Sequence, residues 1–179
     1  MSSFTERMIG AARLDAGIYE EVEHDSEAIG QAVGVVLLSS VAAGVGSMLY
    51  LDLVTALVAG TIAALLGWLI WAFLTWFVGT KVLPEAQTEA DMGQLLRTIG
   101  FAASPGILRV VGIIPGIGGL LVLICDIWML AAMVVAVRQA LDYTSTWRAV
   151  GVCAIGFVIL LVLQVAVLAL MGVPATPGQ

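Results

Sequence analysis

The sequence has few charged residues, and this scarcity argues against a soluble protein. Only 11% of the 179 residues are charged, 61% are hydrophobic, and the mean hydropathy is +1.08. A soluble domain carries roughly a quarter charged residues. The composition therefore predicts an integral membrane protein whose helices form one all-α bundle and a single domain.

Cysteine and histidine are also scarce, which removes most catalytic and metal-binding arrangements. Cys125 and Cys153 are the two cysteines, and both fall inside apolar segments, so we expect no disulfide framework and no metal or redox site. His24 is the only histidine and lies outside these segments. The sequence shows no Ser-His-Asp, Cys-His or paired-carboxylate pattern. We therefore expect a protein that is not an enzyme and that holds no cofactor.

Basic clusters are missing, whereas acidic residues gather in one place. Six acids lie within the thirteen residues from Asp15 to Glu27. This balance argues against nucleic acid and anionic head groups as partners, because both need basic clusters. We interpret part of this segment as a surface for docking another protein. Its residues are Glu20, Glu21, Glu23, His24 and Asp25. A solvated helix face is the alternative, and the i, i+4 spacing of Glu20 and His24 also leaves a divalent-metal site open.

Residues 1–27 form an acidic segment before the first apolar run. Ser3 and Glu6 have the spacing of a capping box, which predicts a short amphipathic helix over residues 3–14 that lies on the membrane surface. A frayed terminus is the alternative. A second short helix follows to about residue 24, and Asp25 or Ser26 would cap the first span.

Five apolar segments predict five membrane spans over residues 28–172. Their limits are about 28–50, 54–78, 92–111, 118–140 and 147–171, and residues 173–179 are expected to form a disordered tail. The third segment is the least apolar, but the distribution of basic residues supports it, because Lys and Arg favour the cytoplasmic side. With five spans, the inner side holds Arg7, Arg13, Lys81, Arg97, Arg138 and Arg148. We therefore expect a plasma (inner) membrane protein with a cytoplasmic N-terminus and an outer C-terminus.

Glycine spacing predicts where the spans pack closely. Gly30 and Gly34 form a GxxxG pair in the first span, and such pairs let helices approach one another in lipid. Ala56, Gly60 and Ala64 form a similar ridge of small residues in the second span.

The region from Thr98 to Arg138 combines an apolar composition with charges and helix breakers. Pro105 interrupts the third span, and Pro115 with Gly116 predicts a turn, so the third and fourth spans should form a hairpin. Arg97, Arg109 and Asp126 then form a polar core, because a charge in lipid needs a partner or water. For straight helices, Asp126 lies about 6 Å in depth from Arg97 and about 12 Å from Arg109. A bend at Pro105 would reverse this order.

Several motifs resemble the bacterial and archaeal branch of the Yip-domain family (Ypt/Rab-interacting membrane proteins). They are Leu14–Ala28 before the first span, Gly30–Ala32, Gly100–Gly106, Ile114–Gly118, Ile127–Trp128 and Val135–Arg138. The resemblance implies a five-span bundle with a cytoplasmic N-terminus. Eukaryotic members are non-enzymatic secretory-pathway proteins that bind Rab GTPases and other Yip proteins. This chain lacks their long N-terminal domain and their Asp-Leu-Tyr-Gly-Pro motif, so Rab binding is not carried over.

These observations favour a non-enzymatic membrane scaffold that works with the lipid bilayer and with a protein partner or further copies of itself. The polar core would then be a structural ion pair that is closed and dry. The alternative is a small transporter or channel for an ion or polar solute, which requires a wet cavity that reaches Arg97, Arg109 and Asp126. An unpaired, exposed Asp126 is a third possibility for the core.

Overall fold

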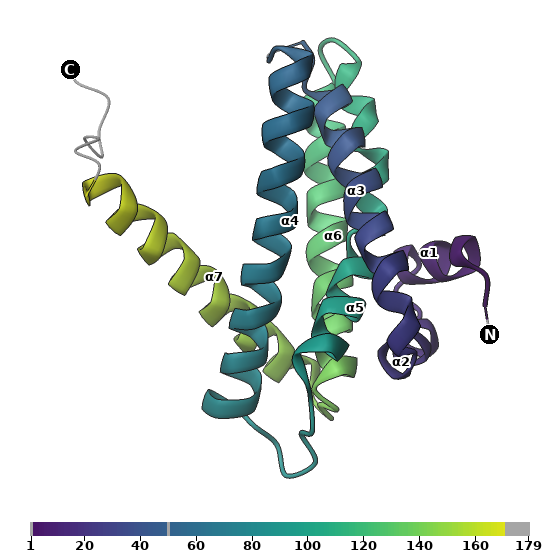
Figure 1. Ribbon diagram of the computed structural model, residues 1–179, viewed down its shortest axis with the longest axis vertical. Coiled ribbons are helices and arrows are strands. Elements are labelled where there is room, and N and C mark those ends of the chain that lie inside the picture. The colour runs from purple at the N-terminus through teal and green to yellow at the C-terminus, as the bar shows by residue number, and fades with distance from the viewer. Residues whose placement is uncertain (1, 50, 171–179) are drawn as a thin grey trace.

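The computed structural model describes residues 2–49 and 51–170, and its regular elements there are all helical (Figure 1). The α-helices are α1 (Phe4–Ala12), α2 (Ala16–His24), α3 (Ile29–Gly46), α4 (Leu53–Phe77), α5 (Met92–Ala102), α6 (Gly118–Ala140) and α7 (Thr146–Leu170). Two 3₁₀ segments, η1 (Ser26–Ala28) and η3 (Ser104–Ile113), and a π-helical turn, η2 (Val78–Val82), extend them. The predicted all-α fold is confirmed. The predicted tail at 173–179 lies outside the described residues.

Five helical segments are long and apolar enough to cross a membrane, as predicted. They are Ser26–Gly46, Leu53–Val82, Met92–Ile113, Gly118–Ala140 and Thr146–Leu163. The third has the lowest mean hydropathy of the five, 1.3, but also the largest buried share, 56%. Its polar residues are tolerated because protein rather than lipid surrounds them. The second, with 11% buried, faces outward along most of its length.

The third span changes helix type at Pro105. A capping box between Asp91 and Gln94 starts α5. Pro105 has no backbone N–H to continue the α-helical ladder. The chain therefore tightens into the ten-residue 3₁₀ helix η3, which begins at Ser104. This break lies where the sequence predicted one.

The 3₁₀ helix η3 packs closely against α3 and α6, and glycines make this approach possible. A Cβ atom on Gly46 of α3 would lie 2.1 Å from the carbonyl oxygen of Arg109. A Cβ atom on Gly112 would lie 2.7 Å from the carbonyl oxygen of Gly46. By contrast, a Cβ on Gly30 would meet nothing within 4 Å, and one on Gly34 would touch only the Phe4 ring, at 3.7 Å. The predicted close approach of two spans at the GxxxG pair is therefore wrong.

The N-terminal helices α1 and α2 pack against one half of the bundle, beside α5 and α6 (Figure 1). The predicted capping box of Ser3 and Glu6 is present and starts α1. The Phe4 ring packs edge-on against Phe101, with 6.5 Å between centroids. The indole Nε1 of Trp128 on α6 donates to the carbonyl oxygen of Ala12, at 2.7 Å. These contacts hold the segment as part of the fold, so the frayed-terminus alternative is wrong.

The last span, α7, leaves the bundle at an angle (Figure 1). It contacts α4, α6 and η2. Tyr143, in the loop before α7, joins this end of the molecule together, because its hydroxyl donates to the carbonyl oxygens of Gly79 (3.0 Å) and Leu83 (2.7 Å). The loop from η2 to α5 and the loop from α6 to α7 are therefore bonded to each other.

Candidate functional site

Two of the three predicted polar-core residues form an ion pair. The Nε atom of Arg109, on η3, donates to Oδ1 of Asp126, on α6, at 2.7 Å, and Nη2 of Arg109 bonds the same oxygen. The side chains remain 29% and 41% exposed, respectively. An ion pair inside a span offsets the cost of each charge in lipid. The third possibility raised by the sequence, an unpaired Asp126, is therefore wrong.

Arg97 does not take part in this pair, which corrects the straight-helix estimate. Its Nε donates to the carbonyl oxygen of Val22 at 3.0 Å, and its Nη2 bonds the carbonyl oxygen of Glu23. Two physical causes explain the difference. The 3₁₀ residues rise about 2.0 Å each instead of 1.5 Å, so Arg97 lies farther from the turn than an α-helix predicts. The unpaired carbonyls at the end of α2 also offer Arg97 a partner within reach.

The predicted turn between the third and fourth spans lies at residues 114–117. Gly116 has φ = +83°, a left-handed conformation that favours glycine. Pro105, by contrast, is buried at the start of η3, where it breaks the span. Together they bring η3 back against α6, and this places Arg109 beside Asp126.

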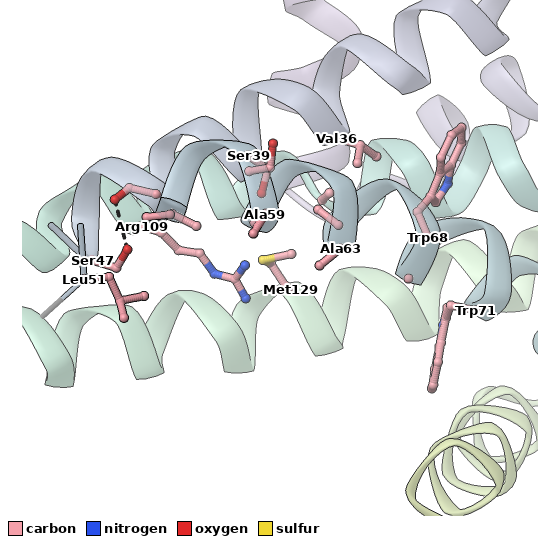
Figure 2. Close-up of a pocket in the computed structure, with 18 of the residues that line it drawn as sticks. Val36, Ser39, Ser47, Leu51, Ala59, Ala63, Trp68, Trp71, Arg109 and Met129 are labelled. Carbon is pink, nitrogen blue, oxygen red and sulfur yellow. Dashed lines mark hydrogen bonds between the residues drawn. The ribbon is translucent and has the colours of Figure 1, made fainter. Parts of the chain in front are cut away.

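A cavity of about 750 Å³ lies between α3, α4 and α6, and Arg109 lines it. Figure 2 shows the Arg109 side chain extending into this cavity toward Met129, while Trp68 and Trp71 lie at the far end. Most of the lining is apolar, and small residues of α4, such as Ala59, form one wall. Sequence reasoning missed this cavity, because the ridge of Ala56, Gly60 and Ala64 suggested helix contact. Ala56 does pack beside Gly44 of α3, but all three residues also line the open space.

A second, smaller cavity of about 270 Å³ is lined by both charged residues of the pair. Gly46 and Gly112 contribute to its wall, so the close approach of α3 and η3 borders this space. Arg109 lines both cavities, and Asp126 lines only the smaller one. The guanidinium therefore stands where the two spaces meet.

The predicted docking residues fall into two groups, and the first is bonded within the chain. Arg7 is 2% exposed and forms ion pairs with Glu21 (2.9 Å) and Asp25 (2.7 Å). Its Nη1 donates to Gln31 of α3 at 3.0 Å. Hydrogen bonds from Ser2, followed by Arg7, lower the pKa of Glu21 to about 2. These two acids therefore join α2 to α1 through Arg7, and Arg7 joins both to the bundle through Gln31.

Glu23 is also bonded within the chain, whereas Glu20 and His24 form the second, exposed group. Glu23 is 3% exposed and accepts a hydrogen bond from Gln94 of α5 at 3.1 Å. Burial, with the charge of Asp142, raises the pKa of Glu23 to about 7. Glu20 and His24 are exposed, and only these two remain free for a partner among the five predicted residues. In the described part of the chain, no three His, Cys, Asp or Glu side chains gather as a metal site would require.

Comparison with known families covers most of the chain. The family model of the Yip1 domain matches residues 18–167. The chain belongs to the Yip1 domain family. This finding confirms the resemblance to Yip-domain proteins, and it identifies a multi-pass membrane protein. No curated protein and no solved structure matches the chain significantly.

The Yip1 domain covers every residue of the candidate sites except those contributed by α1. It begins within α2 and ends within α7, so it includes Arg97, Arg109 and Asp126. Arg7, which holds Glu21 and Asp25, precedes it. The match therefore assigns the polar pair and both cavities to the Yip1 domain itself.

Proposed function

We propose that this Yip1-domain protein is a non-enzymatic membrane scaffold that docks other membrane proteins through its N-terminal helices. One observation carries the proposal: α1 and α2 are fixed to the spans by hydrogen bonds that involve Arg7, Arg97 and Trp128, of which the Arg97 bond is buried. A segment held in this way presents its outer face in a constant position relative to the membrane. Its exposed side chains can then act as a preformed binding surface.

The chemistry of that outer face favours a basic partner. Glu20, Glu27 and Asp142 are exposed. The pKa of His24 is raised, first by its hydrogen bond to the carbonyl oxygen of Glu20 and then by the charges of nearby acids, Asp142 among them. Juxtamembrane segments of membrane proteins are rich in Lys and Arg on the cytoplasmic side. An acidic surface at the same level is complementary to such segments, and this complementarity speeds encounter and gives specificity.

The basic residues of this chain support a cytoplasmic location for that surface. Arg97 bonds α2, and Arg148 pairs with Glu85 in the loop that precedes α5. Arg138 donates to the carbonyl oxygen of Tyr143 in the loop that precedes α7. These residues lie at the end of the bundle that carries the N-terminal helices. An excess of Lys and Arg at one end favours the cytoplasmic side, so the proposed orientation is N-terminus inside and C-terminus outside.

The experiment is affinity purification in mild detergent, with quantification of any membrane protein that copurifies. Replacing Glu20 and Glu27 by lysine should reduce the captured amount at least tenfold, because it reverses the charge of the docking face. Glu89→Lys is the matched control, since Glu89 is an exposed acid of the loop before α5. Equal capture by the double variant and the control would contradict the proposal.

The second candidate function is transport of an ion or polar solute through the Arg109–Asp126 site. The two cavities that meet at Arg109 favour it. The apolar lining of the larger cavity and the closed ion pair weigh against it, because a polar solute needs hydrogen-bonding groups along its path. Flux of a solute into liposomes that contain the purified protein, abolished by Asp126→Asn, would establish this function in place of the scaffold.

A further inference from the structure

The ion pair in the membrane leaves two polar atoms without a partner. Arg109 uses Nε and Nη2 to bond Oδ1 of Asp126. Among the described residues, neither Nη1 of Arg109 nor Oδ2 of Asp126 has a hydrogen-bond partner. Both side chains are partly exposed and line the smaller cavity. The pair therefore offers one cationic donor and one anionic acceptor side by side, with no net charge.

A ligand that satisfies both atoms carries a negative and a positive group close together. Guanidinium groups bind phosphate oxygens well, and a carboxylate accepts hydrogen bonds from a primary ammonium. The head group of an ethanolamine phospholipid has both groups and no net charge. The matching neutrality of site and head group avoids leaving a buried charge unpaired.

The larger cavity suits the apolar part of the same molecule. Along α4 its lining runs from Thr55 to Trp71, which corresponds to about 24 Å of helix. One leaflet of the hydrocarbon core is about 15 Å thick, so the cavity is long enough for an acyl chain. Its volume, about 750 Å³, lies within the range of roughly 300–1,000 Å³ of ligand pockets. Figure 2 shows Arg109 near one end of this space and Trp68 and Trp71 near the other.

The depth of Arg109 agrees with the position of a head group. Arg109 lies four residues before the end of η3 at Ile113, which is about 8 Å of 3₁₀ rise. Asp126 lies eight residues after the start of α6 at Gly118, which is about 12 Å of α-helical rise, so the pair lies in the half of the span nearer one membrane surface. Ser39 adds a polar group along the route: it is 4% exposed, lines the larger cavity, and its hydroxyl makes no hydrogen bond within the described residues.

We propose that the two cavities bind one phospholipid with a primary-amine head group. The phosphate accepts from Nη1 of Arg109, the ammonium donates to Oδ2 of Asp126, and one acyl chain occupies the larger cavity. This inference goes beyond the scaffold function and does not depend on it, since the acidic docking face lies elsewhere on the molecule. A second copy of the chain seated in the cavity is the competing occupant.

Native mass spectrometry of the full chain, titrated with defined lipids in mild detergent, tests the proposal. Dioleoyl phosphatidylethanolamine should bind at least tenfold more tightly than the choline and glycerol lipids with the same chains. Choline has no N–H to donate to Asp126, and the glycerol head group has no cation. Asp126→Asn should remove the preference for the ethanolamine lipid over the choline lipid.

A second variant leaves Arg109 and Asp126 unchanged, so the test does not depend on whether Asp126→Asn folds. Ala63→Leu extends a side chain into the larger cavity and should lower ethanolamine-lipid binding at least tenfold. Ala154→Leu, at an exposed position of α7 outside the cavity, is the matched control and should bind as the parent does. Equal binding of the three lipids, unchanged binding by Ala63→Leu, or a lipid-free dimer that fills the cavity would overturn the proposal.

Discussion

The Nε atom of Arg97 donates a hydrogen bond to the carbonyl oxygen of Val22, across 3.0 Å. Val22 belongs to the last turn of α2, where backbone carbonyls have no partner within the helix. A cation at this position also interacts favourably with the helix dipole. Arg97 thus joins the segment before the first span to the third span.

Replacing Arg97 by glutamine should release α2 from the bundle. Hydrogen bonds to a charged group contribute about 1.5–3 kcal/mol, and this change removes two of them. We expect faster limited proteolysis within residues 2–25 while the spans stay intact. Arg138→Gln is the control, because Arg138 also donates to a backbone carbonyl, that of Tyr143 at 3.2 Å, but on the loop before α7. Equal cleavage rates in the two variants would contradict this role of Arg97.

Docking of α2 should weaken as the pH rises from about 5 to 8. Burial raises the pKa of Glu23 from 4.5 to about 7, so the docked state holds this proton more tightly than the released state. The stabilisation of docked α2 by protonated Glu23 is then present at low pH and is lost as the pH rises through 7. The ratio of cleavage rates, parent to Glu23→Gln, should increase over this range. Taking the ratio at each pH cancels the pH dependence of the protease, and a constant ratio would refute the assignment.

Arg7→Gln should destabilise the N-terminal helices by about 2 kcal/mol, because Glu21 and Asp25 lose their shared cation. The measurement is the Tm of the purified protein, compared with that of Arg13→Gln. Arg13 is exposed and has no side-chain bond within the described residues, so its replacement should leave the Tm unchanged. The idea that Arg7 holds these helices fails if both variants melt at the parent Tm.

Gly46→Ala should destabilise the protein by about 1–3 kcal/mol, since its methyl group would overlap the carbonyl oxygen of Arg109. Gly30→Ala, in the same helix, should be neutral or stabilising, because nothing lies within 4 Å of the added atom. Unfolding in a denaturing detergent compares the two. A Gly46→Ala protein as stable as Gly30→Ala would contradict the close packing of α3 on η3.

The sequence predicted the number of spans and the break at Pro105, because hydropathy and proline act locally. It did not predict the partner of Arg97. That estimate assumed an α-helical rise through the third span, and it ignored the free carbonyls at the end of α2, which only the folded chain brings near. The spacing of small residues also gave a wrong prediction, that of a close helix contact at Gly30 and Gly34. Gly30 and Gly34 have the spacing of a helix contact, but a contact also requires a second backbone at that place.

The acidic segment illustrates the same limit for the candidate site. Its composition predicted a surface, and Glu20 and His24 are exposed as a surface requires. The other three acids bond within the chain instead. Arg7 pairs with Glu21, 14 residues away in sequence, and with Asp25. Gln94 bonds Glu23, 71 residues away. Charge alone could not distinguish the two groups, because the distinction depends on which face of α2 meets the bundle.

The 3₁₀ helix η3 also sets a rule for insertions and deletions in the third span. With three residues per turn, Gly106, Arg109 and Gly112 stand in one row along the helix. Removing one residue between Pro105 and Arg109 would rotate Arg109 by about 120° relative to α5, so α5 and the Arg109–Asp126 pair could not both keep their present contacts. Removing three residues would restore the angle and shorten the segment by about 6 Å. The segment from Ser104 to Ile113 should therefore tolerate changes of length only in steps of three residues. This periodicity, as much as the identity of Arg109, keeps the charge in the cavity.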